Sequence, residues 1–330
     1  MIIRLENQPY CLLCGKEGKL LYSQLSDNLF SVEGKWNIIT CTDCGLHWLN
    51  PRPIKDDIGK LYTNYHTHQV ASKTRIGGSL KEGVRKSILR SVYGYPVGRS
   101  RFFWLGILLS PLPLVQDAVG AKIMMLDYKL RGKLLDVGAG SGEFLKNMQE
   151  LGWDVSGIDP DPYAAAVAQN AYGISILPQT LDNTSLPDES FDVITLDHVI
   201  EHLPDPHESL LKIHRLLKPG GLIVVMTPNL DSLGHRRYKK SWLHLDPPRH
   251  LYLFQRDSLQ KLIKSAEFNI IKSRSVSSSA WWVWIACHVI KTHGHMQAGT
   301  LTRNDLRLSM KIRGALFTIV EELTFENNAW

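Results

Sequence analysis

The 330-residue sequence lacks the features that mark a membrane-spanning, secreted or disordered chain. No run of 18 or more apolar residues occurs, and the longest apolar stretch, residues 102–115, has 14 residues and two prolines. The first ten residues hold one arginine and no apolar run of signal length, so we expect no secretory signal. Hydrophobic residues make up 44% of the chain, which excludes a disordered protein. We therefore expect a cytoplasmic protein whose cysteines are reduced.

Charge of one sign is in only slight excess. The chain has 38 Lys and Arg against 32 Asp and Glu, a formal net charge of +6, which by itself does not indicate nucleic-acid binding. Residues 1–50 carry a net charge of −1, whereas a nucleic-acid-binding ribbon would be basic. A zinc-ribbon protein that binds nucleic acid or modifies RNA is therefore the alternative from a different functional class.

Cysteines are few, but four of the five form two C-x2-C-G units separated by 26 residues. Two such units can supply four thiolates in a tetrahedron, as in a closed structural zinc site. The glycine after each unit allows the positive φ that a tight turn often needs. Iron is the main rival metal, and four unrelated thiols or two disulfides would also satisfy the pattern. The predicted ligands are Cys11, Cys14, Cys41 and Cys44, whereas Cys287 is expected to be a buried thiol.

The segment around these cysteines reads as a zinc ribbon. Residues 20–22 and 36–40 have the composition of short strands, and the prolines at positions 51 and 53 are expected to end regular pairing. We predict four segments: a zinc ribbon over residues 1–53, a basic and apolar helical linker over 54–129, a catalytic domain over 130–276 and a C-terminal helical extension over 277–330.

The linker combines a basic stretch with the longest apolar one. Residues 73–101 carry eight Lys or Arg and a single acid, Glu82. The preferred interpretation is a solvated helical face followed by a buried core helix. The alternative is peripheral contact of residues 73–115 with an anionic membrane surface.

A strand, a glycine turn and a helix follow one another from residue 133. Residues 133–137 read as a buried strand, and G-A-G-S-G at 138–142 leads into a helical pattern. The spacing departs from the dinucleotide pattern G-x-G-x-x-G, and no P-loop lysine follows. Further strands are predicted near 153–158, 174–177, 191–196, 222–226 and 268–276, with helices between most of them. This alternation predicts a doubly wound α/β sheet with ligands at the carboxyl ends of its strands.

The motifs LLDVGAGSGEFL, GIDPD, FDVITLDHVIEHLPDP and RLLKPGGLIVVMTPN follow in this order within residues 130–275. Together they resemble the successive motifs of class I S-adenosylmethionine-dependent methyltransferases, in particular the branch that includes the ubiquinone-biosynthesis O-methyltransferases. The N-terminal double cysteine unit resembles zinc-binding methyltransferases of sugar and cell-surface polysaccharide pathways. The resemblance implies a Rossmann-like sheet that ends in an antiparallel hairpin, and S-adenosylmethionine as cofactor.

The resemblance also implies which residues meet the cofactor. The glycines would line its methionine and ribose end, Asp159 would accept the ribose hydroxyls, and Asp182 would lie by the adenine. Helix capping is the alternative role for Asp182 and Asp197. The implied cofactor-binding residues are Asp136, Gly138, Gly140, Gly142, Asp159, Leu181, Asp182, Asp197 and His198.

Histidines are the candidate general bases, because a hydroxyl acceptor usually needs one. We consider His198, His244 and His250, each of which could instead be a structural histidine. Arg249 is a candidate phosphate-binding residue.

Residues 198–202 also match the zinc-peptidase pattern H-x-x-E-H. The peptidase interpretation accounts for no other motif of this chain, so it is disfavoured. Some ubiquinone-branch relatives hold a metal here with Glu, Glu and His. His198 stands where the first Glu would be, which leaves a catalytic metal open.

Two stretches near the C-terminus have apolar residues in a pattern of regular secondary structure. Residues 281–290 read as either the last strand or a core helix, and residues 306–323 as an amphipathic helix.

We expect an S-adenosylmethionine-dependent methyltransferase acting on a small molecule or glycan, such as a nucleotide sugar or lipid-linked saccharide. A quinone or other aromatic acceptor is the alternative. We do not expect nucleic acid as a partner. Peripheral association with a membrane remains an alternative.

Overall fold

The computed structural model describes residues 2–62, 80–99, 101–296, 310, 313–318, 320 and 321. The chain divides into two units. The sheet unit comprises Thr67–Asp197 and Arg215–Met226, and the ribbon unit comprises Met1–His66, His198–His214 and Thr227–Trp330. Each unit combines parts of several of the four predicted segments. The domain boundaries of those segments stay predictions.

Five parallel strands form the sheet of the sheet unit, in the order β10–β9–β6–β7–β8. The strands are β6 (Lys133–Val137), β7 (Asp154–Ile158), β8 (Ile176–Leu177), β9 (Phe191–Asp197) and β10 (Leu217–Met226). All lie where strands were predicted. The chain order reverses between β6 and β9, and at such a switch point the connections leave in opposite directions and open a crevice for ligands.

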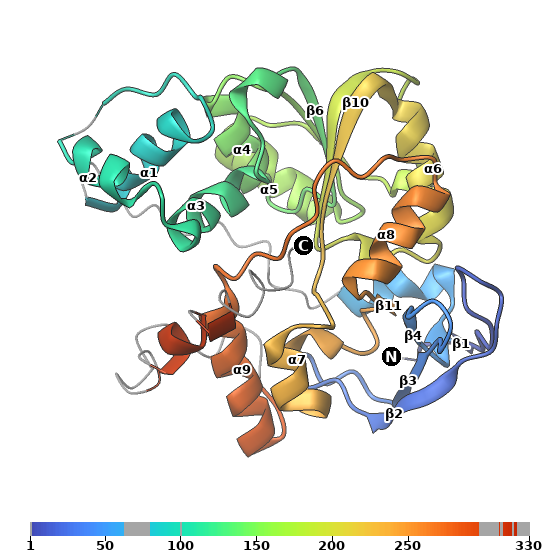
Figure 1. Ribbon diagram of the computed structural model, residues 1–330. Coiled ribbons are helices and arrows are strands. Elements are labelled where there is room, and N and C mark those ends of the chain that lie inside the picture. The colour runs from blue at the N-terminus through green and yellow to red at the C-terminus, as the bar shows by residue number, and fades with distance from the viewer. Residues whose placement is uncertain are drawn as a thin grey trace. The chain divides into compact units, whose positions relative to one another are not determined.

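Helices connect these strands (Figure 1). They are α4 (Glu143–Glu150), α5 (Pro162–Tyr172) and α6 (Pro206–Leu216), with the short 3-10 helix η5 (Leu181–Asn183) before β9. Leu145 and Met148 of α4 are fully buried and pack with Leu134 and Val193 of the sheet. Leu145 and Met148 thus join α4 to the core of the sheet, as a right-handed βαβ connection requires.

Three helices precede the sheet in sequence: α1 (Leu80–Ser91), α2 (Phe103–Leu109) and α3 (Pro113–Gly120). The 3-10 helices η3 (Ala121–Ile123) and η4 (Tyr128–Leu130) complete the connection. The preferred interpretation of residues 102–115 as a buried core helix is wrong, because Trp104 and Leu108 of α2 are more than 70% exposed. The buried residues of α2 are Phe103 and Gly106, and the helix packs on α1.

The ribbon unit contains an antiparallel sheet in the order β11–β4–β3–β2. Its strands are β2 (Lys19–Leu25), β3 (Trp36–Thr40), β4 (His47–Leu49) and β11 (Tyr252–Leu253). The two strands predicted here are confirmed. The outermost strand, β11, comes from about 200 residues further along the chain, as the Trp48–Tyr252 register shows.

A second, two-stranded sheet corrects one expectation about the prolines. Arg52–Pro53 (β5) pairs antiparallel with Leu5–Glu6 (β1), although Pro53 was expected to end pairing. The pairing is possible because this strand is an edge, where a residue without an N–H leaves no ladder bond broken. After it comes the 3-10 helix η1 (Lys55–Tyr62).

The rest of the ribbon unit is helical. It contains η6 (Ile200–His202), α7 (Leu233–Tyr238), η7 (Lys239–Ser241), η8 (Leu243–Leu245), α8 (Arg256–Ser265) and α9 (Ala280–His293). The ambiguous stretch 281–290 is therefore a helix, and residues 313–318 are helical as well, as an amphipathic terminal helix predicts.

The expected sixth strand at residues 268–276 is wrong, and the part of the chain that the structure describes contains no antiparallel hairpin beside β10. Ile271 in this segment is 82% exposed, so its apolar side chains are not buried as they would be in a strand of the sheet.

Within the described residues, no single helix is long and apolar enough to cross a membrane. Phe103–Leu109 together with Pro113–Leu130 reach the required length and apolarity only as a pair bent by 118°.

Candidate functional site

The glycine turn of the sheet unit brings Asp159 against its main chain. Gly138, Gly140 and Gly142 all have positive φ, at 74°, 51° and 76°, in the turn between β6 and α4. Asp159 directly follows β7, and its Oδ2 accepts a 2.8 Å hydrogen bond from the Gly140 N–H. Its Oδ1 accepts a second bond, of 2.9 Å, from the Asp161 N–H. A carboxylate thus faces the turn, at the strand ends where an α/β sheet binds its ligand.

Gly142 has a packing role as well. A Cβ at this residue would lie 2.8 Å from Cβ of Ala168 in α5, closer than two carbons can approach. Glycine therefore serves both the left-handed φ of the turn and the close approach of α5.

Asp136 is buried inside the sheet rather than exposed at its edge. Oγ1 of Thr195 in β9 donates a 2.7 Å hydrogen bond to its carboxyl group. Burial, with the neighbouring charges of Asp197 and Asp159, raises the pKa of Asp136 to about 8. Thr195 is a residue that the sequence interpretation missed, because only the β6–β9 register, in which Asp136 faces Thr195, pairs the two.

Three further predicted cofactor residues lie in the sheet unit. Leu181 is buried and Asp182 exposed in η5, and Asp197 is the exposed last residue of β9. Val137 of β6 pairs with Leu196 of β9 in the parallel ladder. The next residues, Gly138 and Asp197, therefore both lie at the carboxyl ends of these neighbouring strands. The cofactor roles of these residues stay predictions.

A second polar cluster lies within the ribbon unit, around Glu201. His198 has the left-handed φ of 55°, and its Nδ1 lies 3.3 Å from Oε1 of Glu201. Thr227 donates a 2.9 Å hydrogen bond from Oγ1 to Oε2 of the same carboxylate. Glu201 is fully buried, whereas half of the His198 side chain is exposed. A strained backbone that presents an exposed imidazole on a buried carboxylate is typical of functional sites.

Glu201 carries a negative charge despite its burial. Burial alone would raise its pKa, but the hydrogen bond from His198 and the nearby rings of His202 and His250 lower the pKa to about 2. In the tautomer of His198 that carries its proton on Nδ1, next to this carboxylate, Nε2 is the proton acceptor.

Two further histidines lie beside this carboxylate, and each uses its Nδ1 on a main-chain carbonyl. Nδ1 of His202 donates to the Arg249 carbonyl at 3.0 Å, and Nδ1 of His250 donates to the His244 carbonyl at 2.8 Å. Their Nε2 atoms therefore keep lone pairs in the neutral rings. Ligand atoms of Glu201, His202 and His250 lie within 4.8 Å of one another, so this set could hold a divalent cation. Burial lowers the pKa of His202 to about 4, which keeps it neutral.

The peptidase interpretation of H-x-x-E-H does not fit this geometry. Residues 200–202 form one turn of 3-10 helix, and His198 lies outside it with a left-handed backbone. The zinc-binding pair of that pattern needs both histidines on one α-helical face.

Arg249 does not fit the predicted phosphate contact. Its side chain is fully buried, and its Nη1 and Nη2 donate to the Asp27 carboxylate at 2.8 and 2.7 Å. Nε and Nη2 donate to Asp246 as well, and the guanidinium lies 4.4 Å from the centroid of the Phe30 ring. Two carboxylates already neutralise Arg249, and no part of its side chain is exposed for a phosphate to contact. Asp27 lies 222 residues away in sequence and was not predicted.

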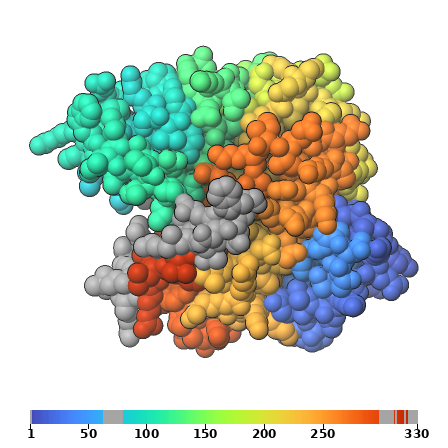
Figure 2. Space-filling model, viewed as in Figure 1, coloured from blue at the N-terminus to red at the C-terminus, as the bar shows by residue number. Residues whose placement is uncertain are grey.

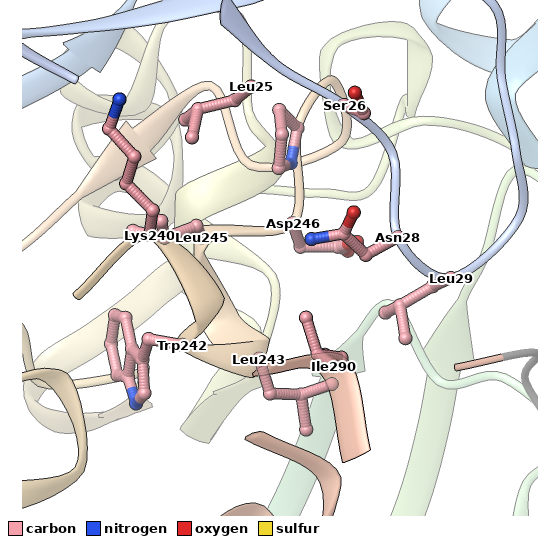
Figure 3. A pocket seen from close by; sticks show the side chains of 11 residues that line it. Leu25, Ser26, Asn28, Leu29, Lys240, Trp242, Leu243, Leu245, Asp246 and Ile290 are labelled. Carbon is pink, nitrogen blue, oxygen red and sulfur yellow. The ribbon is translucent and has the colours of Figure 1, made fainter. Parts of the chain in front are cut away.

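A small pocket within the ribbon unit borders this ion-pair network (Figure 3). The side chains of Asn28 and Asp246 lie close together in it, next to Leu243 and Leu245. None of the predicted base histidines lines it. The candidate catalytic histidines therefore belong to the cluster around Glu201 and not to this pocket.

The four predicted cysteine ligands lie together in two turns with the same hydrogen bonds. Cys11 N–H donates to the Lys16 carbonyl and Cys41 N–H to the Leu46 carbonyl, each at 2.8 Å. Gly15 and Gly45 have φ values of 70° and 79°, as the C-x2-C-G pattern predicts.

The four sulfurs lie within 4.8 Å of one another, and no disulfide links them. A tetrahedral zinc with Zn–S bonds of about 2.3 Å places its sulfurs about 3.8 Å apart. This donor set therefore fits zinc in a closed structural site.

Comparison with known proteins agrees with the motifs and the sheet. The family model described as a methyltransferase domain matches residues 116–273, which include the glycine turn, Asp159 and the cluster sequence at 198–202. Residues 116–273 are therefore a methyltransferase domain, of the class I, S-adenosylmethionine-dependent type that the motifs indicate. S-adenosylmethionine is accordingly the cofactor of this methyltransferase domain.

Among curated proteins, the methyltransferase is similar to ubiquinone biosynthesis O-methyltransferases. The relative from Cereibacter sphaeroides is 30% identical over 164 residues, which cover 46% of this chain and 66% of the relative. The relative from Pseudomonas aeruginosa is 35% identical over 109 residues, which cover 31% of this chain and 47% of the relative. The chain thus spans about half to two thirds of the length of these relatives.

Solved structures of other methyltransferases are similar at a lower level. An S-adenosylmethionine-dependent methyltransferase from Thermotoga maritima has 25% identity and a TM-score of 0.39, over 51% of this chain and 77% of that one. One from Archaeoglobus fulgidus has 20% identity and a TM-score of 0.40, over 60% of this chain and 95% of that one. These TM-scores are too low to support an argument about substrate.

Proposed function

We propose that this chain transfers the methyl group of S-adenosylmethionine to a hydroxyl oxygen of a small molecule or glycan. The observation that carries the proposal is the Asp159 carboxylate on the Gly140 N–H at the strand ends, in a domain that matches the methyltransferase family. A carboxylate there can accept both hydroxyls of a ribose. The glycine main chain has no Cβ to obstruct a nucleoside beside it.

The proposed general base is His198. The cofactor supplies an activated methyl group on a sulfonium sulfur, so the protein mainly aligns the acceptor and removes its proton. As the acceptor oxygen bonds to the methyl carbon and the carbon–sulfur bond breaks, Nε2 of His198 would take the hydroxyl proton. Glu201, 3.3 Å from Nδ1, would orient the ring and stabilise its cationic form.

Chain connectivity supports this assignment. His198 is the residue after Asp197, which ends β9, and consecutive Cα atoms are about 3.8 Å apart. His198 therefore begins within one residue of the strand end that the family resemblance associates with the transferred methyl.

The other two candidate bases fit the role less well. Burial lowers the pKa of His244 to about 3, which makes it a poor proton acceptor near neutral pH. His250 is buried and gives its Nδ1 proton to the His244 carbonyl, so it serves to position its neighbours. His244 stacks on His198 with ring centroids 5.8 Å apart. This stacking limits rotation of the His198 ring, the proposed base.

For the acceptor we propose a saccharide, as a nucleotide sugar or a lipid-linked saccharide. The basis is the combination of a cysteine ribbon with this methyltransferase domain, which resembles enzymes of sugar and polysaccharide pathways. A quinone or other aromatic hydroxyl is the second candidate, favoured by the names of the relatives described above. We propose that the four cysteines hold zinc with a structural role.

The test is methyl transfer by the full chain from isotope-labelled S-adenosylmethionine, with mass spectrometry of the products. One set of reactions contains nucleotide sugars and the other contains catechols that carry a short prenyl chain. His198→Gln should lower kcat by about a hundredfold or more, as is typical of losing a general base. The loss in kcat should exceed any change in the dissociation constant of S-adenosylhomocysteine measured by calorimetry, because proton removal depends on the imidazole.

A matched control is His293→Gln, an exposed histidine at the end of α9, which should retain full activity. If the catechols acquired the labelled methyl group and the nucleotide sugars did not, the saccharide assignment would be overturned, whereas methyl transfer would stand. Failure of the chain to bind S-adenosylhomocysteine would overturn the whole proposal.

A further inference from the structure

The helix α2 of the sheet unit directs apolar side chains outward. Trp104 is 71% exposed and Leu108 is 74% exposed, and Leu112 in the following turn is 50% exposed. Leu105 and Ile107 are also exposed, so four of the seven residues of this helix offer apolar surface. We call Trp104, Leu105, Ile107, Leu108 and Leu112 the α2 patch. In Figure 2 the segment that holds α1 to α3, in teal, lies at the surface in this view.

The opposite face of α2 fixes this orientation. Phe103 and Gly106, three residues apart, are the buried residues of the helix. A Cβ at Gly106 would lie 2.3 Å from Cβ of Ser87 in α1, so the two backbones are in close contact. Because α2 is held by this inner face, the patch does not arise from a loosely attached helix.

Basic residues outnumber acidic ones in the sequence around the patch. From Glu82 to Asp117 the chain contains Arg85, Lys86, Arg90, Arg99 and Arg101 against two acids, of which Glu82 pairs with Arg85 and Lys86 and Asp117 is buried. Arg99 lies 5.5 Å from the centroid of the Phe103 ring, and Arg101 lies 5.9 Å from that of Phe102. Both guanidinium groups thus adjoin the helix that carries the patch.

This combination fits one partner chemistry better than others. An anionic lipid surface offers phosphates to arginines and an apolar layer beneath them, and tryptophan favours that boundary. A protein partner would need a complementary acidic rim around an apolar socket, for which this chain offers no observation. Exposed apolar surface of this kind otherwise disfavours a monomer in water.

We propose that the α2 patch docks on the surface of an anionic bilayer. Trp104 and Leu108 enter the boundary between headgroups and acyl chains, and Arg99 and Arg101 contact lipid phosphates. A helix of seven residues is about 10 Å long, whereas the hydrocarbon core is about 30 Å thick, so α2 lies in the interface without crossing it. The proposal does not depend on the identity of the methyl acceptor.

The test is co-sedimentation of the full chain with lipid vesicles. One set is pure phosphatidylcholine, and the other contains about 30% phosphatidylglycerol, a surface that attracts basic segments. We expect binding to the anionic vesicles that falls steeply between about 50 mM and about 500 mM NaCl, because salt screens the arginines. The double variant Trp104→Ser/Leu108→Ser should bind at least tenfold more weakly.

The control is Leu20→Ser/Ile271→Ser, which removes two exposed apolar side chains from the ribbon unit and should bind like the unchanged chain. Melting curves by circular dichroism establish that both double variants fold. Equal sedimentation of Trp104→Ser/Leu108→Ser and the unchanged chain would overturn the proposal, as would absence of binding to anionic vesicles. The unchanged chain could also fail to bind vesicles but form a dimer in light scattering, with Trp104→Ser/Leu108→Ser remaining a monomer. That result would assign the α2 patch to contact with a second copy of the chain instead.

Discussion

The Asp159 carboxylate accepts a 2.8 Å hydrogen bond from the main-chain N–H of Gly140, a residue 19 positions earlier in the chain. The contact joins the end of β7 to the turn that leaves β6, and the two strands are neighbours in the parallel ladder. A carboxylate held by two main-chain donors keeps its orientation. It is therefore positioned before any nucleoside binds, which lowers the cost of ordering the site.

Removing this carboxylate should weaken cofactor binding. Hydrogen bonds to a charged group contribute about 1.5–3 kcal/mol, so Asp159→Ala should raise the dissociation constant of S-adenosylhomocysteine about tenfold to a hundredfold. Isothermal titration calorimetry measures this directly. The control is Asp154→Ala at the exposed start of β7, which should bind normally. Equal weakening in both variants would contradict a specific role for Asp159.

The cysteine centre should hold one zinc ion per chain. Because a tetrahedral site needs all four thiolates, Cys41→Ser/Cys44→Ser should lose the metal and unfold at a lower temperature. Elemental mass spectrometry of the purified protein gives the metal and its amount. Cys287→Ser, at the buried fifth cysteine outside the cluster, should keep the zinc. Iron in place of zinc would refute the choice of metal, and metal retention by the double variant would refute the site.

Local signals in the sequence predicted much of the fold. The strand, glycine turn and helix from residue 133, and both cysteine turns, depend on residues within about ten positions of one another, and each lies where predicted. The positive φ at Gly15 and Gly45 follows from the same local chemistry.

Long-range partners explain what the sequence could not predict. Arg249 suits a phosphate as well as a carboxylate, and only the folded chain brings it to Asp27, 222 residues away. The apolar stretch at 102–115 reads as a core helix until the structure shows that only the face of α2 with Phe103 and Gly106 is covered. The segment at 268–276 has the composition of a strand but finds no partner strand in the described part of the chain.

The Arg249 ion pair should be important for stability. Its guanidinium and the Asp27 side chain are both fully buried, so removing one charge leaves the other uncompensated. Such losses cost about 3–5 kcal/mol, so Arg249→Met should lower the free energy of unfolding by about that amount in urea denaturation. The matched control is Lys146→Met, which breaks the solvent-accessible pair with Glu150 at 2.6 Å. That loss should stay below about 1 kcal/mol. Similar losses in the two variants would show that burial does not strengthen the Arg249 pair.

Buried neutral histidines should make the fold sensitive to mild acid. Burial, with a smaller contribution from His235, lowers the pKa of His47 to about 4. Between pH 6.5 and pH 4 the unfolded chain therefore binds a proton at His47 that the folded chain does not, and stability falls as the pH falls. For this one group the loss between pH 7.5 and pH 5 is about 2 kcal/mol. His47→Gln should reduce the difference between urea denaturation at these two pH values by that amount. His293→Gln, which changes an exposed histidine, should leave the difference unchanged. If His47→Gln kept the full pH dependence, the protonation that destabilises the fold in mild acid would have to occur at another group.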